Sequence, residues 1–176
     1  MTKFFFPDLG DTMFDGPTTL EPLLAEHPFL KGMKKEHLAL ITGCASNVKW
    51  DAGTYVFKEG QDADQFYIVR QGTIAIEAFS PAHGPLVLQT VGEGDILGWA
   101  WLVPPYRWHF DGHATDLVRA IAFDGKCLRT KCEKDHELGY ELLKRFSEIM
   151  SQRLDVTRMQ LVDLYDDMPT KGVRRK

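Results

Sequence analysis

The spacing of apolar residues changes twice along the chain. Between residues 20 and 44 the spacing is helical, in short segments. From residue 45 to 123 apolar and polar residues alternate, and from 132 to 165 the spacing is helical again. The interruptions of the first part are Pro22, Pro28 and Gly32. The sequence therefore predicts short helices, a β domain and a long C-terminal helix.

The alternating part consists of many short runs that end at glycines. The runs are Val48–Trp50, Tyr55–Phe57, Phe66–Val69, Ile74–Ile76, Leu86–Val91 and Val118–Ala122. Evenly spaced short strands with glycine turns are typical of β architectures that close their edges. The prediction is a mainly β fold with flanking helices, in which a β jelly-roll barrel (a cupin-like double-stranded β-helix) precedes the long helix.

The long helix carries one apolar stripe. Its members are Leu138, Leu142, Phe146, Met150, Leu154, Thr157, Leu161 and Leu164. The second half steps by three and four residues, as a coiled-coil seam does, and predicts a homodimer through this helix. The alternative is that the stripe packs back on its own barrel. The expected divisions are an arm (1–19), the lead-in and barrel (20–131), the C-terminal helices (132–168) and a basic tail (169–176).

Composition limits the possible functions. The 176 residues are 44% hydrophobic and 26% charged, which is globular, and the net charge of −4 gives no general attraction to nucleic acid. No apolar run reaches the ~20 residues of a membrane span, and no signal sequence is recognisable, so a cytoplasmic location is expected. The cysteines Cys44, Cys127 and Cys132 form no CxxC pair and are expected to be reduced.

The segment Gly94–Leu102 has the pattern of an anion-binding elbow. Gly98 would let the backbone approach a ligand closely. The residues after it, Trp99 to Leu102, would supply amide donors at the start of a short helix. Asp95 is expected to order the turn by accepting neighbouring amide hydrogens.

Together these features resemble a cyclic nucleotide-binding domain of the catabolite activator (Crp/Fnr) type. The resemblance runs through AGTYVFKEGQDADQFYIVRQGTIAI and VGEGDILG, and ends in RLDVTRMQL on the long helix. It implies a non-enzymatic regulatory module that binds cAMP or cGMP, or a similar small anion, and needs no other cofactor. Because the helix-turn-helix of the family's transcription factors is not found before Lys176, we expect no direct DNA binding; signalling would pass through the dimer or a protein partner.

The resemblance also assigns ligand-binding positions. Gly98, Ala100 and Leu102 correspond to the amide cradle for the cyclic phosphate, whereas Trp99 replaces the glutamate that takes the ribose hydroxyl. Indole cannot accept that hydrogen bond. Arg107 corresponds to the phosphate-binding arginine if the loop is aligned from the elbow. If it is aligned from the following strand, Tyr106 takes that place.

Other positions have two interpretations. Thr157 matches the family's base-contacting threonine, and Arg158 stands where the family has a serine; both could instead be ordinary helix-surface residues. Trp101 and Trp108, with Trp99, could stack on a bound ring, or they could plug the pocket.

Two alternatives to the sensor remain. One is a protein-interaction module with the same fold and no nucleotide, its pocket plugged by Trp99 or Trp101. The other is a cupin-like metal enzyme that uses His109, Asp111 and His113, which alternate along a predicted strand. The cupin spacing of His-x-His with a downstream glutamate is absent, and no nucleophile elbow occurs, so neither catalytic nor metal-binding residues are assigned.

Overall fold

The structure is a computed structural model that describes residues 20–166, with side chains through Asp163. The predicted arm and basic tail lie outside the described residues. The chain divides after Gly139 into two compact units. The first holds the barrel with its neighbouring helices, and the described part of the second is the remainder of the long helix.

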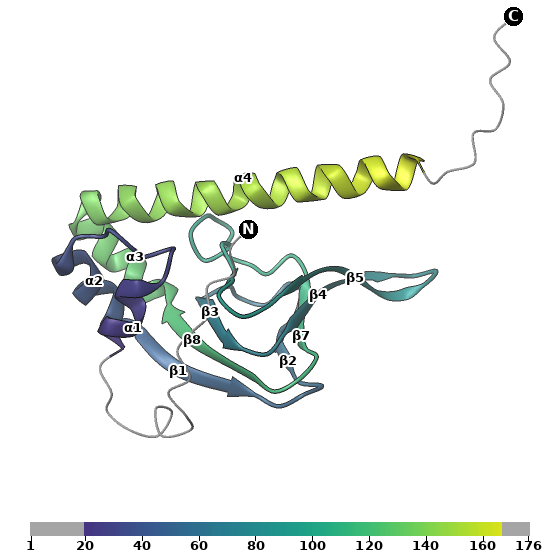
Figure 1. Cartoon of the computed structure of the whole chain (residues 1–176), viewed down its shortest axis with the longest axis horizontal. Helices are drawn as coiled ribbons and strands as arrows, with labels where there is room; N and C mark the ends of the chain where they lie inside the picture. Colours follow the sequence, from purple (N-terminus) through teal and green to yellow (C-terminus); the bar gives the residue numbers. More distant parts are fainter. Residues whose placement is uncertain (1–19, 167–176) are drawn as a thin grey trace, which may run out of the picture. The chain divides into compact units, whose positions relative to one another are not determined.

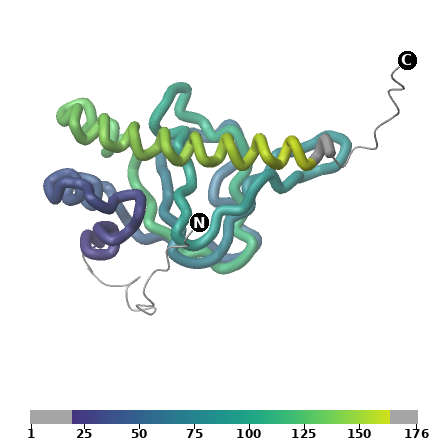
Figure 2. Tube along the Cα trace, turned by 45° about the horizontal axis from the view of Figure 1, so that its top comes forward, coloured from purple at the N-terminus to yellow at the C-terminus, as the bar shows by residue number. Residues whose placement is uncertain are grey.

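The lead-in forms two short helices that lie together in both views (Figure 1, Figure 2). They are α1 (Glu21–Glu26) and α2 (Lys35–Thr42). Pro22 was predicted to interrupt the helix, but it lies in the first turn of α1. The missing N–H of proline costs nothing there, because the first amides of a helix have no intrahelical acceptor.

Within residues 20–166, eight strands form the predicted jelly roll as two antiparallel four-stranded sheets (Figure 1). One sheet has the order β1-β8-β3-β6 and the other β2-β7-β4-β5. The strands are β1 (Ala45–Trp50), β2 (Tyr55–Phe57), β3 (Gln65–Gln71), β4 (Ile74–Ser80), β5 (Gly84–Val91), β6 (Ile96–Leu97), β7 (Asp111–Ala114) and β8 (Val118–Asp124).

Strand β3 is buried on both faces, which explains why its sequence is apolar without alternation. Tyr67 and Val69 belong to the core inside the barrel. On the other face, Phe66 stacks between Phe123 and Trp101, with ring centroids 4.4 Å and 5.3 Å away. This strand therefore separates two apolar cores.

The C-terminal helical part begins earlier than predicted and has a break. Helix α3 (Gly125–Lys134) starts directly after β8, where the Asp124 carboxylate accepts the Cys127 N–H at 2.7 Å. Helix α4 (His136–Asp166) follows after Asp135, which accepts the N–H groups of Glu137 and Leu138. An aspartate that caps a new helix ends the old one, and the apolar period alone does not show such a break.

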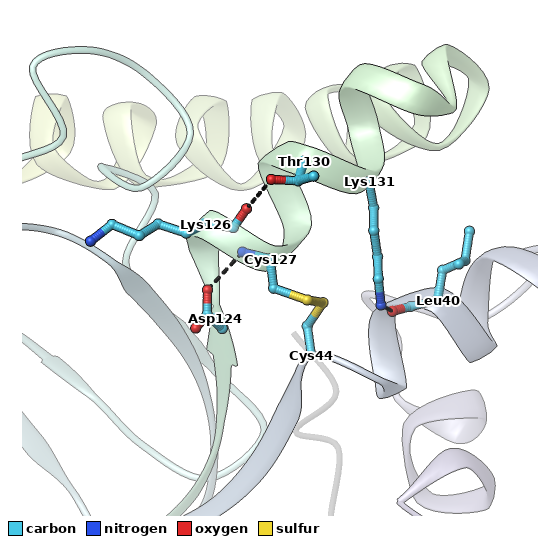
Figure 3. The surroundings of a disulfide bond; sticks show 7 residues. All are labelled: Leu40, Cys44, Asp124, Lys126, Cys127, Thr130 and Lys131. Carbon is cyan, nitrogen blue, oxygen red and sulfur yellow. Dashed lines mark hydrogen bonds between the residues drawn. A yellow bond between two sulfur atoms is a disulfide. The ribbon is translucent and has the colours of Figure 1, made fainter.

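The prediction that all three cysteines are reduced is wrong for two of them. Cys44, which precedes β1, and Cys127, in the first turn of α3, form a disulfide with Cα atoms 6.0 Å apart (Figure 3). The two residues are 83 positions apart, so no local spacing indicates the pair. Cys132 is a free thiol, and burial raises its pKa.

His27 connects the helical lead-in to the turn before the elbow. Its side chain is 1% exposed. Nε2 lies 3.2 Å from the carbonyl oxygen of Gly94, and Nδ1 accepts the N–H of Phe29 at 3.3 Å. Because Nδ1 accepts, Nε2 carries the hydrogen and the ring is neutral. Burial is the main cause that lowers the pKa of His27; the Gly94 carbonyl and Asp95 oppose it.

This environment predicts an acid-sensitive contribution to stability. The unfolded chain binds a proton at His27 near pH 6.5, whereas the folded protein binds it only at lower pH. The contribution is therefore complete above pH 6.5 and is lost as the pH falls through the lowered folded value. Urea unfolding between pH 7.5 and pH 5 measures it. A His27→Gln variant, whose amide reproduces one donor and one acceptor, should show a shallower loss; an unchanged pH slope would contradict the assignment.

Candidate functional site

The elbow is fixed by the turn that precedes it. Gly94, at φ +78°, donates its N–H to the Val69 carbonyl at 2.9 Å. The Asp95 carboxylate accepts the Gly92 N–H at 2.9 Å, as predicted. Strand β6 then pairs with β3 and leads to Gly98, at φ +91°. From here on, the elbow means residues 98–108, which include the end of the predicted elbow and the loop after it. This segment thus leaves the barrel from a defined position.

The predicted short helix after Gly98 does not form. The Leu102 N–H donates to the Trp99 carbonyl at 3.0 Å, which closes a single turn. Pro104 and Pro105 follow; neither has an N–H to donate, and a residue before proline avoids helical backbone angles. The segment is therefore a turn without the aligned amides of a helix start.

Trp108 fills the space beside Gly98. Its ring lies parallel to that of Phe57, with centroids 3.6 Å apart and planes at 7°, and its side chain is 8% exposed. A Cβ built on Gly98 would lie 2.6 Å from the Trp108 ring. The close approach that this glycine allows is thus made by the chain's own indole.

The other two tryptophans point elsewhere, so the elbow does not gather three rings at one place. Trp101 is fully buried against Phe66, in the core on the other side of β3. Trp99 is half-buried, and its ring centroid lies 6.1 Å from that of His109. Of the three tryptophans considered as a plug, only Trp108 lies beside Gly98, whereas Trp99 and Trp101 do not. Aromatic density in the sequence indicated a cluster, but it could not indicate which ring turns inward.

Arg107 faces the surface loop between β2 and β3. Its Nη1 donates to the Gly60 carbonyl at 2.6 Å and lies 3.3 Å from an Asp62 carboxylate oxygen. Its side chain is 55% exposed. Tyr106, the other residue considered for this place, is half-buried at φ +55°. The Arg107 guanidinium thus contacts Gly60 and Asp62 instead of Gly98, and Tyr106 carries no positive charge.

Arg129 of α3 is a residue at this site that the sequence did not indicate. Its guanidinium donates to the Trp101 carbonyl at 2.5 Å and lies 4.4 Å from the centre of the Tyr106 ring. It is also 3.9 Å from Asp64. Arginine four residues into a helix is common, and only the packing of α3 on the barrel gives this one its role.

The remaining predicted positions have local partners. Ala100 is buried, and Leu102 is half-buried. On α4 the Thr157 hydroxyl donates to the Arg153 carbonyl at 2.9 Å, and Arg158 lies 3.4 Å from Asp155 with 65% of its side chain exposed. These contacts describe α4 alone, and they leave the predicted base contacts untested.

The polar residues of the alternative metal site do not converge. Asp111 accepts the Glu59 N–H at 2.7 Å, and His113 lies 3.5 Å from Glu77. His109 precedes β7 and is exposed, rather than sharing a strand face with them. Within the described part of the chain, no three histidine, cysteine or acidic side chains lie together as a metal site requires.

The barrel interior near Trp108 is apolar. Burial raises the pKa of Tyr67 to about 12, and its hydroxyl bonds to the Gln65 side chain at 3.0 Å. The Tyr67 and Trp108 rings are nearly parallel, with centroids 6.5 Å apart. An anion beside these rings would lose its hydration, and neither Tyr67 nor Trp108 carries a charge that could compensate. The residues as arranged do not fit a cyclic phosphate.

The chain belongs to the cyclic nucleotide-binding domain family, whose model matches residues 47–135. Domains of this family are typically regulatory rather than catalytic. Over 157 residues the chain is 26% identical to the CRP-like cAMP-activated global transcriptional regulator of Mycobacterium tuberculosis, covering 89% of this chain and 68% of the relative.

Solved structures show the same fold. A candidate cyclic nucleotide-binding protein from Geobacter metallireducens GS-15 has a TM-score of 0.69 and 25% identity, over 78% of this chain and 98% of that one. The sensor domain of the transcriptional regulator DNR from Pseudomonas aeruginosa has a TM-score of 0.62 and 22% identity, over 77% of this chain and 91% of that one. Among residues 20–166, no helix has both the length and the apolar character that crossing a membrane requires.

Proposed function

We propose that this chain is a non-catalytic regulatory module of the Crp type that, in the conformation described, holds Trp108 against Gly98, where the family resemblance places the cyclic phosphate. The observation that carries the proposal is the contact of the Trp108 ring with Gly98. Two further features support it: Trp99 cannot accept a ribose hydroxyl, and Arg107 is paired with Gly60 and Asp62. The module then acts through protein contacts.

The output of such a module is a helix interface. The exposed apolar residues of α4 include Leu154 and Leu161, each 50% exposed. They belong to the three-and-four spacing predicted from the sequence, so we propose a homodimer through α4 and a protein partner that reads the dimer.

A second candidate is a sensor of cAMP or cGMP in which Trp108 leaves the barrel when the ligand enters. Family membership favours it, together with the backbone freedom of Gly98. The contacts proposed for that state are Gly98, Trp99, Ala100, Trp101, Leu102, Arg107, Trp108, Thr157 and Arg158. Nucleotide affinity would then be reduced by the energy needed to displace the stacked indole.

Calorimetric titration with cAMP and cGMP distinguishes the two. The first proposal predicts no binding heat for the unaltered protein, because Trp108 fills the site. Trp108→Ala removes the plug, and Trp99→Ala is the matched control that leaves it in place. Micromolar binding by the unaltered protein, weakened at least tenfold (about 1.4 kcal/mol) by Arg107→Ala, would overturn the first proposal and establish the sensor. Circular dichroism would verify that each variant is folded.

A further inference from the structure

The first turn of α3 carries one cysteine of the disulfide and also contacts the elbow. Cys127 in the first turn of α3 is joined to Cys44, the residue before β1 (Figure 3). In the same part of α3, the Gly125 N–H donates to the Asp64 carbonyl at 2.6 Å, and a Cβ on Gly125 would lie 3.0 Å from the Trp101 side chain. The first turn of α3 therefore touches both the disulfide and the elbow.

Arg129 extends this connection. Arg129 lies two residues after Cys127 in α3, and its guanidinium donates to the Trp101 carbonyl at 2.5 Å. Lys126, also in the first turn, lies 3.0 Å from Asp64, on the chain that leads into β3. If α3 changed position, the Arg129 guanidinium would move away from the Trp101 carbonyl. The elbow, which carries both Trp101 and Trp108, would then lose this hydrogen bond.

The noncovalent contacts around the disulfide can hold α3 loosely without it. The Lys131 ammonium donates to the Leu40 carbonyl at 2.5 Å (Figure 3). The Asp124 N–H donates to the Cys44 carbonyl at 2.9 Å. Neither hydrogen bond uses a sulfur atom, so opening the disulfide removes neither of them directly. Its removal is therefore expected to loosen the first turn of α3 rather than to unfold the domain.

We propose that Cys44 and Cys127 are a thiol–disulfide modification site whose oxidised form clamps the elbow. The reductant is a dithiol, as a small molecule or a redox protein. One thiolate attacks the half-buried Cys127 sulfur, the S–S bond breaks, and Cys44 leaves as a thiolate that takes up a proton. The second thiol of the reductant then displaces Cys127, so that the dithiol becomes a disulfide and the protein gains two thiols.

Hydrogen exchange of the elbow peptide in the oxidised and reduced protein tests the proposal, with thiol titration to follow the chemistry. Denatured protein should show one thiol before treatment with dithiothreitol and three afterwards. Reduction should accelerate exchange of the amides in residues 98–108 at least tenfold, with no comparable change in β4. Cys132→Ser should respond in the same way, and Cys44→Ser/Cys127→Ser should show fast elbow exchange under both conditions.

Three results would overturn the proposal. Three thiols before reduction would show that the disulfide does not form. If the thiol count rises to three but the hydrogen-exchange rates of residues 98–108 do not change, the disulfide does not influence the elbow. Equal acceleration in β4 would show general destabilisation instead of a local release. None of these readouts depends on whether the barrel binds a nucleotide.

Discussion

Gly72→Ala is expected to lower the free energy of unfolding by about 2–5 kcal/mol, the sum of left-handed backbone strain and overpacking. Gly72 lies in the turn between β3 and β4 at φ +84°. A Cβ at this position would be 2.3 Å from the Leu117 carbonyl oxygen and 2.6 Å from the Asp116 carboxylate. That carboxylate also accepts the Thr73 N–H, so it cannot move without losing a hydrogen bond. Urea unfolding measures the loss.

Gly53→Ala is the matched control. Gly53 has nearly the same backbone angle, φ +83°, but a Cβ there would meet no atom within 4 Å. Only the backbone strain remains, about 1–2 kcal/mol. If both substitutions cost the same, the neighbouring chain at Leu117 yields freely and the steric part of the prediction is wrong.

Replacing both Leu154 and Leu161 by glutamate is expected to convert the proposed dimer into monomers. Both side chains lie on the predicted seam, and each is 50% exposed. Four carboxylates in the seam of two helices would repel one another and lose hydration. We expect the dimer dissociation constant to rise at least 100-fold, about 2.7 kcal/mol. Sedimentation equilibrium measures it.

Val156→Glu is the control for this experiment. Val156 is 56% exposed on the same helix but lies outside the spacing that defines the seam. It should leave the dissociation constant within about threefold of the unaltered value, a difference below 1 kcal/mol. A monomeric unaltered protein at micromolar concentration, or a larger effect from Val156→Glu, would reject a dimer through this seam.

The sequence was sufficient to predict the barrel because its signals are local. Alternating apolar runs and glycine turns depend on neighbours two to four residues away, and six of the eight strands contain the six predicted runs. The break at Asp135 was missed because helical period continues across it. A capping aspartate and an ordinary surface aspartate are the same residue in a sequence.

The site was less predictable because its contacts join distant parts of the chain. The elbow position and the role of Asp95 are encoded within a few residues, and the structure confirms that role. The position of the Trp108 ring depends on its stacking against Phe57. The hydrogen bond from Arg129 to the Trp101 carbonyl depends on how α3 packs against the barrel. The pairing of Cys44 with Cys127 likewise arises only when β1 and α3 meet.

Trp101 and Trp108 of the elbow contact β3 from opposite faces. Trp101 lies against Phe66 in the outer core, while Trp108 lies 6.5 Å from Tyr67 inside the barrel. Phe66 and Tyr67 are consecutive residues of β3, so the elbow contacts both faces of this strand. Because both rings pack on the same strand, we expect displacement of one ring to disturb the close packing on the other face of β3.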